Sequence, residues 1–198
     1  MANLTFYYGT MEVGKTTKLL QDHYNYSKYL INIVVMKPKI DTKGGNKIIS
    51  RIGNNIEASI LIPKKANLLS DKYLKKFMYA EFILVDEAQF LNKKQINQLW
   101  FIAHKYNISV ICYGLKNNFK GDLFEGTAQL FARSDEIHEL TVNCLCGKTA
   151  RFNARRVNGK YSMKGKEVVI DKEKEEVCYI PLCAEHYLEY VYEGKYDK

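Results

Sequence analysis

Gly9-Thr10-Met11-Glu12-Val13-Gly14-Lys15-Thr16 fits the pattern G-x-x-x-x-G-K-[ST] and decides the fold of this 198-residue chain. In this pattern a turn between two glycines points successive backbone N–H groups at a phosphate. Lys15 is expected to reach the β- and γ-phosphates of a nucleotide, and the Thr16 hydroxyl to bind Mg²⁺. An apolar strand is expected at 4–8, and the spacing of apolar side chains predicts a helix over 16–29. Because strand, glycine-rich turn and helix follow one another, residues 9–16 are predicted to bind the phosphates of a nucleotide.

The rest of residues 1–142 alternates between strand-like and helix-like stretches. The predicted strands are 33–37, 58–62, 81–87, 108–113 and 136–142, and the predicted helices are 67–79, 92–106 and 123–132. Asn92 is expected to cap the second of these helices. The polar residues 38–55 are expected to form a long loop that is mobile without a ligand. The alternation is typical of βαβ units and predicts an α/β fold with a mainly parallel sheet.

An acid pair, Asp86 and Glu87, ends the apolar strand 81–87. Ligands bind at the carboxyl ends of parallel strands, so Asp86 is expected to hold Mg²⁺ beside the phosphates. Ala88 and Gln89 follow the pair and are assigned to the same nucleotide site. Glu87 is expected to accept a proton from an attacking hydroxyl or to position a water molecule. Phosphoryl transfer and nucleotide hydrolysis therefore both remain open, and an ordinary charged strand end is the alternative to either.

Four metal-ligating residues lie in two close pairs, Cys144 with Cys146 and Cys183 with His186. Three thiolates and an imidazole match a tetrahedral structural zinc site, although C-x-C is tighter than the usual C-x₂-C spacing. Unrelated thiols and a solvated histidine are the alternative, and Cys178 is expected to stay free. Hydrophobic periodicity breaks up from residue 143 onward. The sequence thus predicts a nucleotide-binding domain at 1–142 and a zinc-binding domain at 143–198.

Composition limits the partners. The formal net charge is +8, but the lysines are spread along the chain, which favours a solvated surface over a nucleic-acid interface. No apolar run approaches the ~20 residues of a membrane-spanning helix. The N-terminus lacks the pattern of a signal peptide, so a cytoplasmic protein without membrane or nucleic-acid partners is expected.

Taken together, these motifs resemble the zinc-containing thymidine kinases, in particular their bacterial branch. Residues 9–17 resemble the family loop G-x-M-x-x-G-K-S/T-T, and residues 85–90 are similar to its D-E-x-Q-F segment. Residues 114–121 resemble G-L-x-x-D-F-R-G, with Asn118 in place of the aspartate. Residues 50–53 and the two metal-ligand pairs also match, so the resemblance covers nearly the whole chain.

This resemblance implies an α/β, RecA-like P-loop core with a small zinc-binding lobe that carries a lasso loop. It implies transfer of the γ-phosphate of ATP, with Mg²⁺, to the 5′-hydroxyl of thymidine to give dTMP. Glu87 would be the catalytic base, and a homotetramer with a structural zinc is expected. Use of deoxyuridine and feedback by dTTP are left open. The implied substrate-binding residues are Arg51, Phe90, Phe119, Tyr179 and, through their backbone, Glu167, Val168, Val169, Ile170 and Asp171.

Two other functions remain as alternatives. Asp86 to Gln89 also resembles the acidic box of nucleic-acid-dependent ATPases, which predicts an ATPase stimulated by DNA or RNA. Such an enzyme usually has a second arginine-bearing motif, but Arg133 is the only arginine between residues 52 and 150. A non-catalytic nucleotide-dependent interaction module is the third possibility, and the intact acid pair argues against it.

Overall fold

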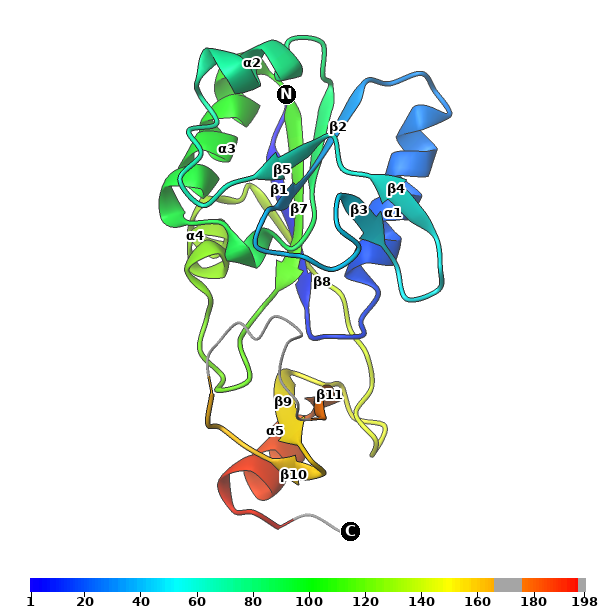
Figure 1. Cartoon of the computed structure of the whole chain (residues 1–198), viewed down its shortest axis with the longest axis vertical. Helices are drawn as coiled ribbons and strands as arrows, with labels where there is room; N and C mark the ends of the chain where they lie inside the picture. Colours follow the sequence, from blue (N-terminus) through cyan, green and yellow to red (C-terminus); the bar gives the residue numbers. More distant parts are fainter. Residues whose placement is uncertain (166–175, 196–198) are drawn as a thin grey trace.

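The computed structural model describes residues 1–165 and 176–195, which form a central six-stranded parallel sheet and a smaller three-stranded sheet (Figure 1). The central order is β5-β2-β6-β7-β1-β8, with every neighbouring pair parallel. The predicted α/β fold with a mainly parallel sheet is therefore confirmed. The strands are β1 (Leu4–Gly9), β2 (Ile33–Pro38), β5 (Ile60–Ile62), β6 (Phe82–Val85), β7 (Ser109–Leu115) and β8 (Glu136–Glu139).

Helices cover both faces of this sheet (Figure 1). Helix α1 (Lys15–Ser27) lies on one face, and α2 (Asp71–Phe77), α3 (Lys93–Tyr106) and α4 (Glu125–Arg133) lie on the other. The strands of a parallel sheet with helices on both faces are nearly continuous runs of apolar residues. The sequences of β6 (FILV) and β7 (SVICYGL) show such runs.

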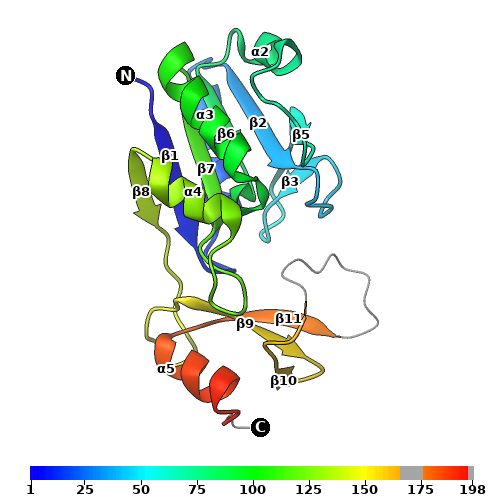
Figure 2. The ribbon, with the colours of Figure 1, turned by 90° about the vertical axis from the view of Figure 1, so that its left-hand side faces the viewer.

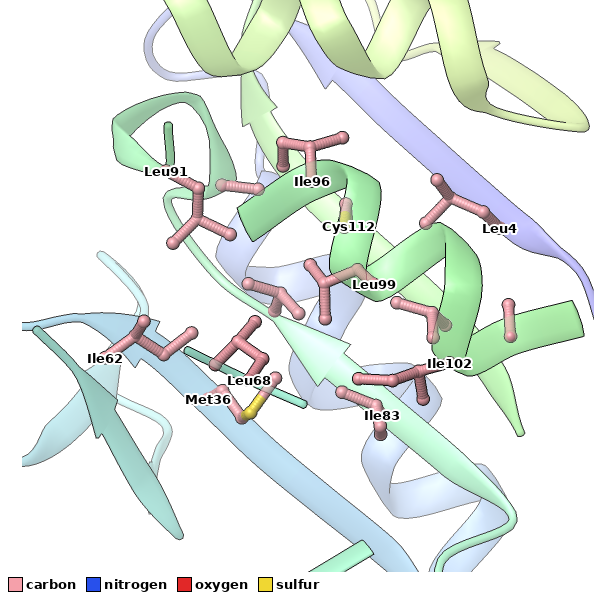
Figure 3. Close-up of a cluster of buried hydrophobic side chains, with 14 of the residues drawn as sticks. Leu4, Met36, Ile62, Leu68, Ile83, Leu91, Ile96, Leu99, Ile102 and Cys112 are labelled. Atoms are coloured by element: carbon pink, nitrogen blue, oxygen red, sulfur yellow. The ribbon is translucent and has the colours of Figure 1, made fainter. Parts of the chain in front are cut away.

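Alternation along each strand divides the core into two clusters. Val35, Leu84 and Ile111 pack towards the α1 face. Their neighbours Met36, Ile83 and Cys112 face α3, where Figure 3 shows them beneath Ile96, Leu99 and Ile102. Because successive strand residues point to opposite faces, a short apolar run serves both clusters.

Helix α3 starts with a reciprocal cap. The Asn92 side chain accepts a hydrogen bond from the Gln95 N–H at 2.9 Å, and the Gln95 side chain accepts one from the Asn92 N–H at 3.2 Å. This satisfies two of the free N–H groups at the helix start and confirms the predicted cap, which contributes about 1 kcal/mol.

Helix α2 is shorter than predicted. It starts at Asp71, four residues later than expected, because Asn67 forms local turns instead. The side-chain oxygen of Asn67 accepts a hydrogen bond from the Leu69 N–H, and the Asn67 carbonyl accepts one from the Ser70 hydroxyl. Such local bonds compete with helix formation.

The predicted long loop 38–55 contains part of a hairpin, β3 (Lys47–Ile49) and β4 (Asn55–Glu57). Lys37 organises this segment although it is only 1 % exposed. Its ammonium group donates to the Asp41 carboxylate at 2.8 Å and to the carbonyls of Lys43 and Lys47 at 2.8 and 3.2 Å. A buried cation with all three donors engaged holds the loop against the end of β2.

The smaller sheet, of order β10-β9-β11, is antiparallel and lies beneath the carboxyl ends of β1 and β7 (Figure 2). Its strands are β9 (Phe152–Val157), β10 (Lys160–Tyr161) and β11 (Val177–Leu182), followed by α5 (Ala184–Tyr187) and the π-helical turn η2 (Leu188–Tyr192). The hydroxyl of Tyr187 donates to the carbonyl of Phe119 at 2.6 Å and joins the two parts. The division at residue 143 stays a prediction.

Among residues 1–165 and 176–195, no helix combines the length and the apolar character that a membrane crossing requires.

Candidate active site

The phosphate loop connects β1 directly to α1. Gly14 has φ 82°, a left-handed conformation that suits glycine, and α1 begins at the next residue, Lys15. The Lys15 side chain is only 8 % exposed and donates to the carbonyl of Thr10 at 2.6 Å. Burial lowers the pKa of Lys15 to about 8, against the opposing effect of Glu87 and Asp86. The free backbone N–H groups of the first helical turn and a buried amine thus lie together, as an anion site requires.

The two predicted Mg²⁺ ligands are neighbours. The Thr16 hydroxyl donates to a carboxylate oxygen of Asp86 at 3.3 Å, across 70 residues of sequence. Burial, and secondly the charge of Glu87, raise the pKa of Asp86 to about 7. A hydroxyl and a carboxylate are hard oxygen ligands of the kind Mg²⁺ prefers, and a divalent cation would offset the buried negative charge. These residues therefore fit the ion.

This buried acid leads to a prediction about stability. A raised pKa means that the protonated form stabilises the fold fully below pH 3.8, and that this contribution is lost as the pH rises towards 7. Asp86→Asn keeps the shape and stays neutral. Without added Mg²⁺ or nucleotide, we expect the variant to exceed wild type in free energy of unfolding by on the order of 1–3 kcal/mol at pH 8, and to match it near pH 4. Urea unfolding at both pH values measures this, and a less stable variant at pH 8 would contradict it.

Glu87 follows β6 and has an unusual backbone, with φ 49° and ψ 37°. It is half-buried, and its carboxylate accepts a hydrogen bond from the Gln89 amide at 2.5 Å. Gln89 lies in η1 (Ala88–Phe90), a single 3₁₀ turn after the acid pair. Glu87 lines a cavity at the carboxyl end of the central sheet.

This cavity measures about 530 Å³ and joins the phosphate loop to the smaller sheet. Ten of the predicted site residues line it: Met11, Glu12, Gly14, Lys15, Thr16, Arg51, Glu87, Phe90, Phe119 and Tyr179. Among the described residues, Gly9, Thr10, Val13, Asp86, Ala88 and Gln89 are not part of the lining. The predicted residues 167–171 lie outside the described part of the chain.

Aromatic side chains also line this cavity. The centroids of Phe119 and Tyr179 lie 6.4 Å apart, and Phe90 meets Phe124 edge-on at 5.7 Å. Rings in this arrangement offer flat apolar surfaces to a planar ligand. The lining of one cavity thus combines a phosphate loop, the acid Glu87 and aromatic surfaces that suit a ring system.

Arg51 lies beside the phosphate loop, where it forms an ion pair with Glu12. Both side chains are about half exposed, so the pair contributes little to stability. The ion pair joins Arg51, which follows β3, to the phosphate loop, and Arg51 also lines the cavity.

Asn118 differs from the aspartate of the resembling motif, and its contacts explain why the exchange is tolerated. Its side-chain oxygen accepts from the N–H groups of Lys120 and Asp122, at 2.9 and 3.1 Å. This turn needs an acceptor and no charge, which an amide oxygen supplies as well as a carboxylate does.

The four predicted zinc ligands converge. The ligand atoms of Cys144, Cys146, Cys183 and His186 all lie within 4.8 Å of one another. The Cys146 and Cys183 sulfurs are 3.7 Å apart, close to the ~3.8 Å edge of a tetrahedron with zinc–sulfur bonds of about 2.3 Å. Burial opposes ionisation of the Cys144 thiol, but hydrogen bonds from Cys183, Cys146 and His186 lower its pKa to about 6. The set fits a structural zinc, and Cys178 is exposed and not part of it.

Asn153 is a site residue that sequence analysis missed. It is 2 % exposed on β9, accepts from the Met11 N–H at 2.6 Å, and donates to the carbonyl of Asn117 at 3.0 Å. One amide thereby joins the smaller sheet to the phosphate loop. A single asparagine in an unremarkable strand carries no local signal for such a contact.

Comparison with known proteins agrees with this geometry. A family model described as thymidine kinase matches residues 2–187. The chain is 36 % identical over 195 residues to a thymidine kinase of Shewanella oneidensis, covering 98 % of this chain and 100 % of that protein. It is 41 % identical over 196 residues to a thymidine kinase of Pasteurella multocida, covering 96 % and 98 %.

A crystal structure of Bacteroides Pif1 bound to single-stranded DNA matches with a TM-score of 0.42 and 17 % identity, over 70 % of this chain and 38 % of that one. So weak a likeness supports no conclusion about function. The family model and the near-complete alignments, in contrast, establish that this chain belongs to the thymidine kinase family.

Proposed function

We propose that the protein is an ATP-dependent thymidine kinase that forms dTMP and ADP. This proposal rests on the observation that the phosphate loop, Glu87 and several aromatic side chains line the same cavity. A kinase must hold two substrates with the reacting oxygen in line with the γ-phosphate, so donor and acceptor sites have to share one space.

The proposed donor site consists of residues 9–16 with Asp86, and Ala88 and Gln89 lie next to it. Lys15 and the backbone N–H groups at the start of α1 bind the phosphates of ATP. Thr16 and Asp86 hold Mg²⁺, which neutralises charge on the phosphates when it is bound.

Glu87 is the proposed catalytic base. It accepts the proton of the thymidine 5′-hydroxyl while that oxygen forms a bond to the γ-phosphorus and the bond to the leaving ADP breaks. Phe90, Phe119 and Tyr179 are proposed to hold the nucleoside, and Arg51 to lie near the transferred phosphate. Residues 167–171 are proposed to hold the thymine edge through their backbone.

Zinc is proposed to be structural, bound by Cys144, Cys146, Cys183 and His186. These ligands flank β9 and β11, which bring Asn153 and Tyr179 to the cavity. The cluster around them contains few large apolar side chains, so a metal would supply stability that a small core lacks. A homotetramer is proposed on the basis of family membership, and use of deoxyuridine and feedback by dTTP stay open.

Thymidine-dependent ADP formation tests the proposed function. We expect ADP release from Mg²⁺-ATP to rise at least tenfold when thymidine is added, with dTMP formed in equal amount. Deoxyadenosine and single-stranded DNA serve as parallel additions. Turnover indifferent to every nucleoside but stimulated by DNA, and falling steeply with salt, would favour the nucleic-acid-dependent ATPase instead. ATP binding without any ADP would indicate a non-catalytic module.

A further inference from the structure

Gln89 is a buried residue whose side chain is fixed at both ends. It is 2 % exposed, its amide nitrogen donates to Glu87 at 2.5 Å, and its amide oxygen accepts from the Leu115 N–H at 3.0 Å. A backbone N–H can only donate, so the amide oxygen must face Leu115 and the NH₂ group must face the carboxylate. The orientation of the amide thus follows from its partners.

Two glycines provide the space for this arrangement. A Cβ atom at Gly114 would lie 2.9 Å from the Gln89 amide oxygen and 3.2 Å from its backbone nitrogen. A Cβ atom at Gly126 of α4 would lie 2.8 Å from the Gln89 carbonyl oxygen. Both contacts are too close for any other residue, so β7 and α4 enclose the η1 turn and leave Gln89 little freedom.

The backbone of Glu87 explains why such a fixed partner matters. With φ 49°, Glu87 is neither in the strand before it nor in the turn after it, and a non-glycine residue there carries a cost of about 1 kcal/mol or more. Regular secondary structure does not direct its side chain. The hydrogen bond that the Gln89 amide donates to its carboxylate does so instead.

We propose that Gln89 is the positioning residue of the catalytic base. It holds one carboxylate oxygen of Glu87 so that the other takes the proton of the 5′-hydroxyl, and it acts through Glu87 without touching ATP. Leu115 lies at the end of β7, so the central sheet sets the position of the base through one amide. This inference rests on the proposed function.

The test is a double-mutant cycle between Gln89→Met and Glu87→Gln. Methionine is similar in size and buried readily but forms neither hydrogen bond. In the wild-type background we expect Gln89→Met to lower kcat by roughly 10–100-fold, because a misplaced base reacts poorly, with KM for ATP and thymidine changed less than threefold. In the Glu87→Gln background the same substitution should change kcat less than threefold, because the group it positions is already absent.

Two further variants keep the test decisive. Gln89→Glu keeps the carbon skeleton and the oxygen that accepts from the Leu115 N–H, so it replaces the methionine variant if that variant fails to fold. We expect it to lower kcat as much as Gln89→Met does, because a carboxylate cannot donate a hydrogen bond to an ionised Glu87. Gln98→Met is the matched control. Gln98 is also buried, accepting from the Leu68 N–H at 2.9 Å and donating to Asn67, but it is remote from the cavity, so kcat should stay within twofold.

An equal fold-loss of kcat in both Glu87 backgrounds would overturn the proposal, since Gln89 would then act independently of the base. A rise in KM for ATP at unchanged kcat would overturn it in favour of direct nucleotide contact. Wild type that shows no thymidine-dependent turnover would overturn the proposed function itself. A fourth outcome would overturn the positioning role alone. In it, the wild type is active and Glu87→Gln is inactive, but Gln89→Met has the kcat of wild type.

Discussion

Replacing Glu87 with glutamine is expected to lower kcat by roughly 10²–10⁴-fold, the usual contribution of a general base. Glutamine has the same size and its amide oxygen still accepts from Gln89, so the geometry at the end of β6 is retained. What is lost is the capacity to take a proton at neutral pH. ATP and thymidine should bind nearly as before, because the aromatic side chains and the phosphate loop that line the cavity are unchanged. Steady-state turnover, together with calorimetric titration of ATP, measures the two effects separately.

Glu136→Gln is a suitable control for that experiment. Glu136 is an exposed acid on the outer strand β8, where it accepts from the Asn3 amide, and it lies away from the cavity. Its removal tests the loss of one negative charge and should leave kcat within twofold. Near-normal turnover of Glu87→Gln would remove Glu87 from the role of base and leave positioning and charge neutralisation as the source of the rate.

Loss of a zinc ligand is expected to have the second large effect. Cys183→Ser removes a buried thiolate from the cluster, and serine oxygen is a poor zinc ligand. Structural zinc contributes roughly 10–16 kcal/mol of apparent binding energy in small zinc domains, so the part of the chain that the cluster closes should lose much of its stability without it. Since β9 and β11 carry Asn153 and Tyr179, we expect kcat/KM for thymidine to fall at least 100-fold.

Cys178→Ser is the matched comparison for that variant. Cys178 lies on the same strand β11 but is exposed and outside the ligand cluster. Metal analysis should find about one zinc per chain in wild type and Cys178→Ser, and much less in Cys183→Ser. Thermal unfolding should show a second, lower transition in Cys183→Ser alone. Full zinc content and activity in Cys183→Ser would contradict the assigned ligand set.

Local sequence signals were sufficient for the parts of the site that are continuous in the chain. The phosphate loop, the acid pair after β6 and the cap of α3 each occupy a few successive residues. Their backbone conformations depend on glycine, on the end of an apolar strand or on one capping side chain, all of which are visible in the sequence. The two pairs of predicted zinc ligands are separated by 36 intervening residues, between Cys146 and Cys183. They could be predicted because few combinations of cysteine and histidine can close a tetrahedral site.

Other predictions failed or were absent because they depend on contacts of polar side chains, which hydrophobic periodicity does not record. Lys37 ends the predicted strand 33–37, and its buried ammonium group holds the segment that was predicted as a long loop. The early turn at Asn67, which delays α2, likewise depends on Gln98 of α3, whose side chain binds the Leu68 N–H. Periodicity records apolar burial and carries no information about such pairs.

The sequence by itself determined the parallel α/β architecture and predicted the phosphate loop that precedes α1. Those features follow from hydrophobic periodicity and from the conformations that glycine permits between residues 9 and 16. Only the tertiary structure decided how Glu87 is oriented and how the two sheets meet. Gln89 reaches Leu115, and Asn153 reaches Met11, through single hydrogen bonds across 26 and 142 residues. Such bonds form only after the sheet has brought the two strand ends together, so their effect on the site becomes visible only in the folded chain.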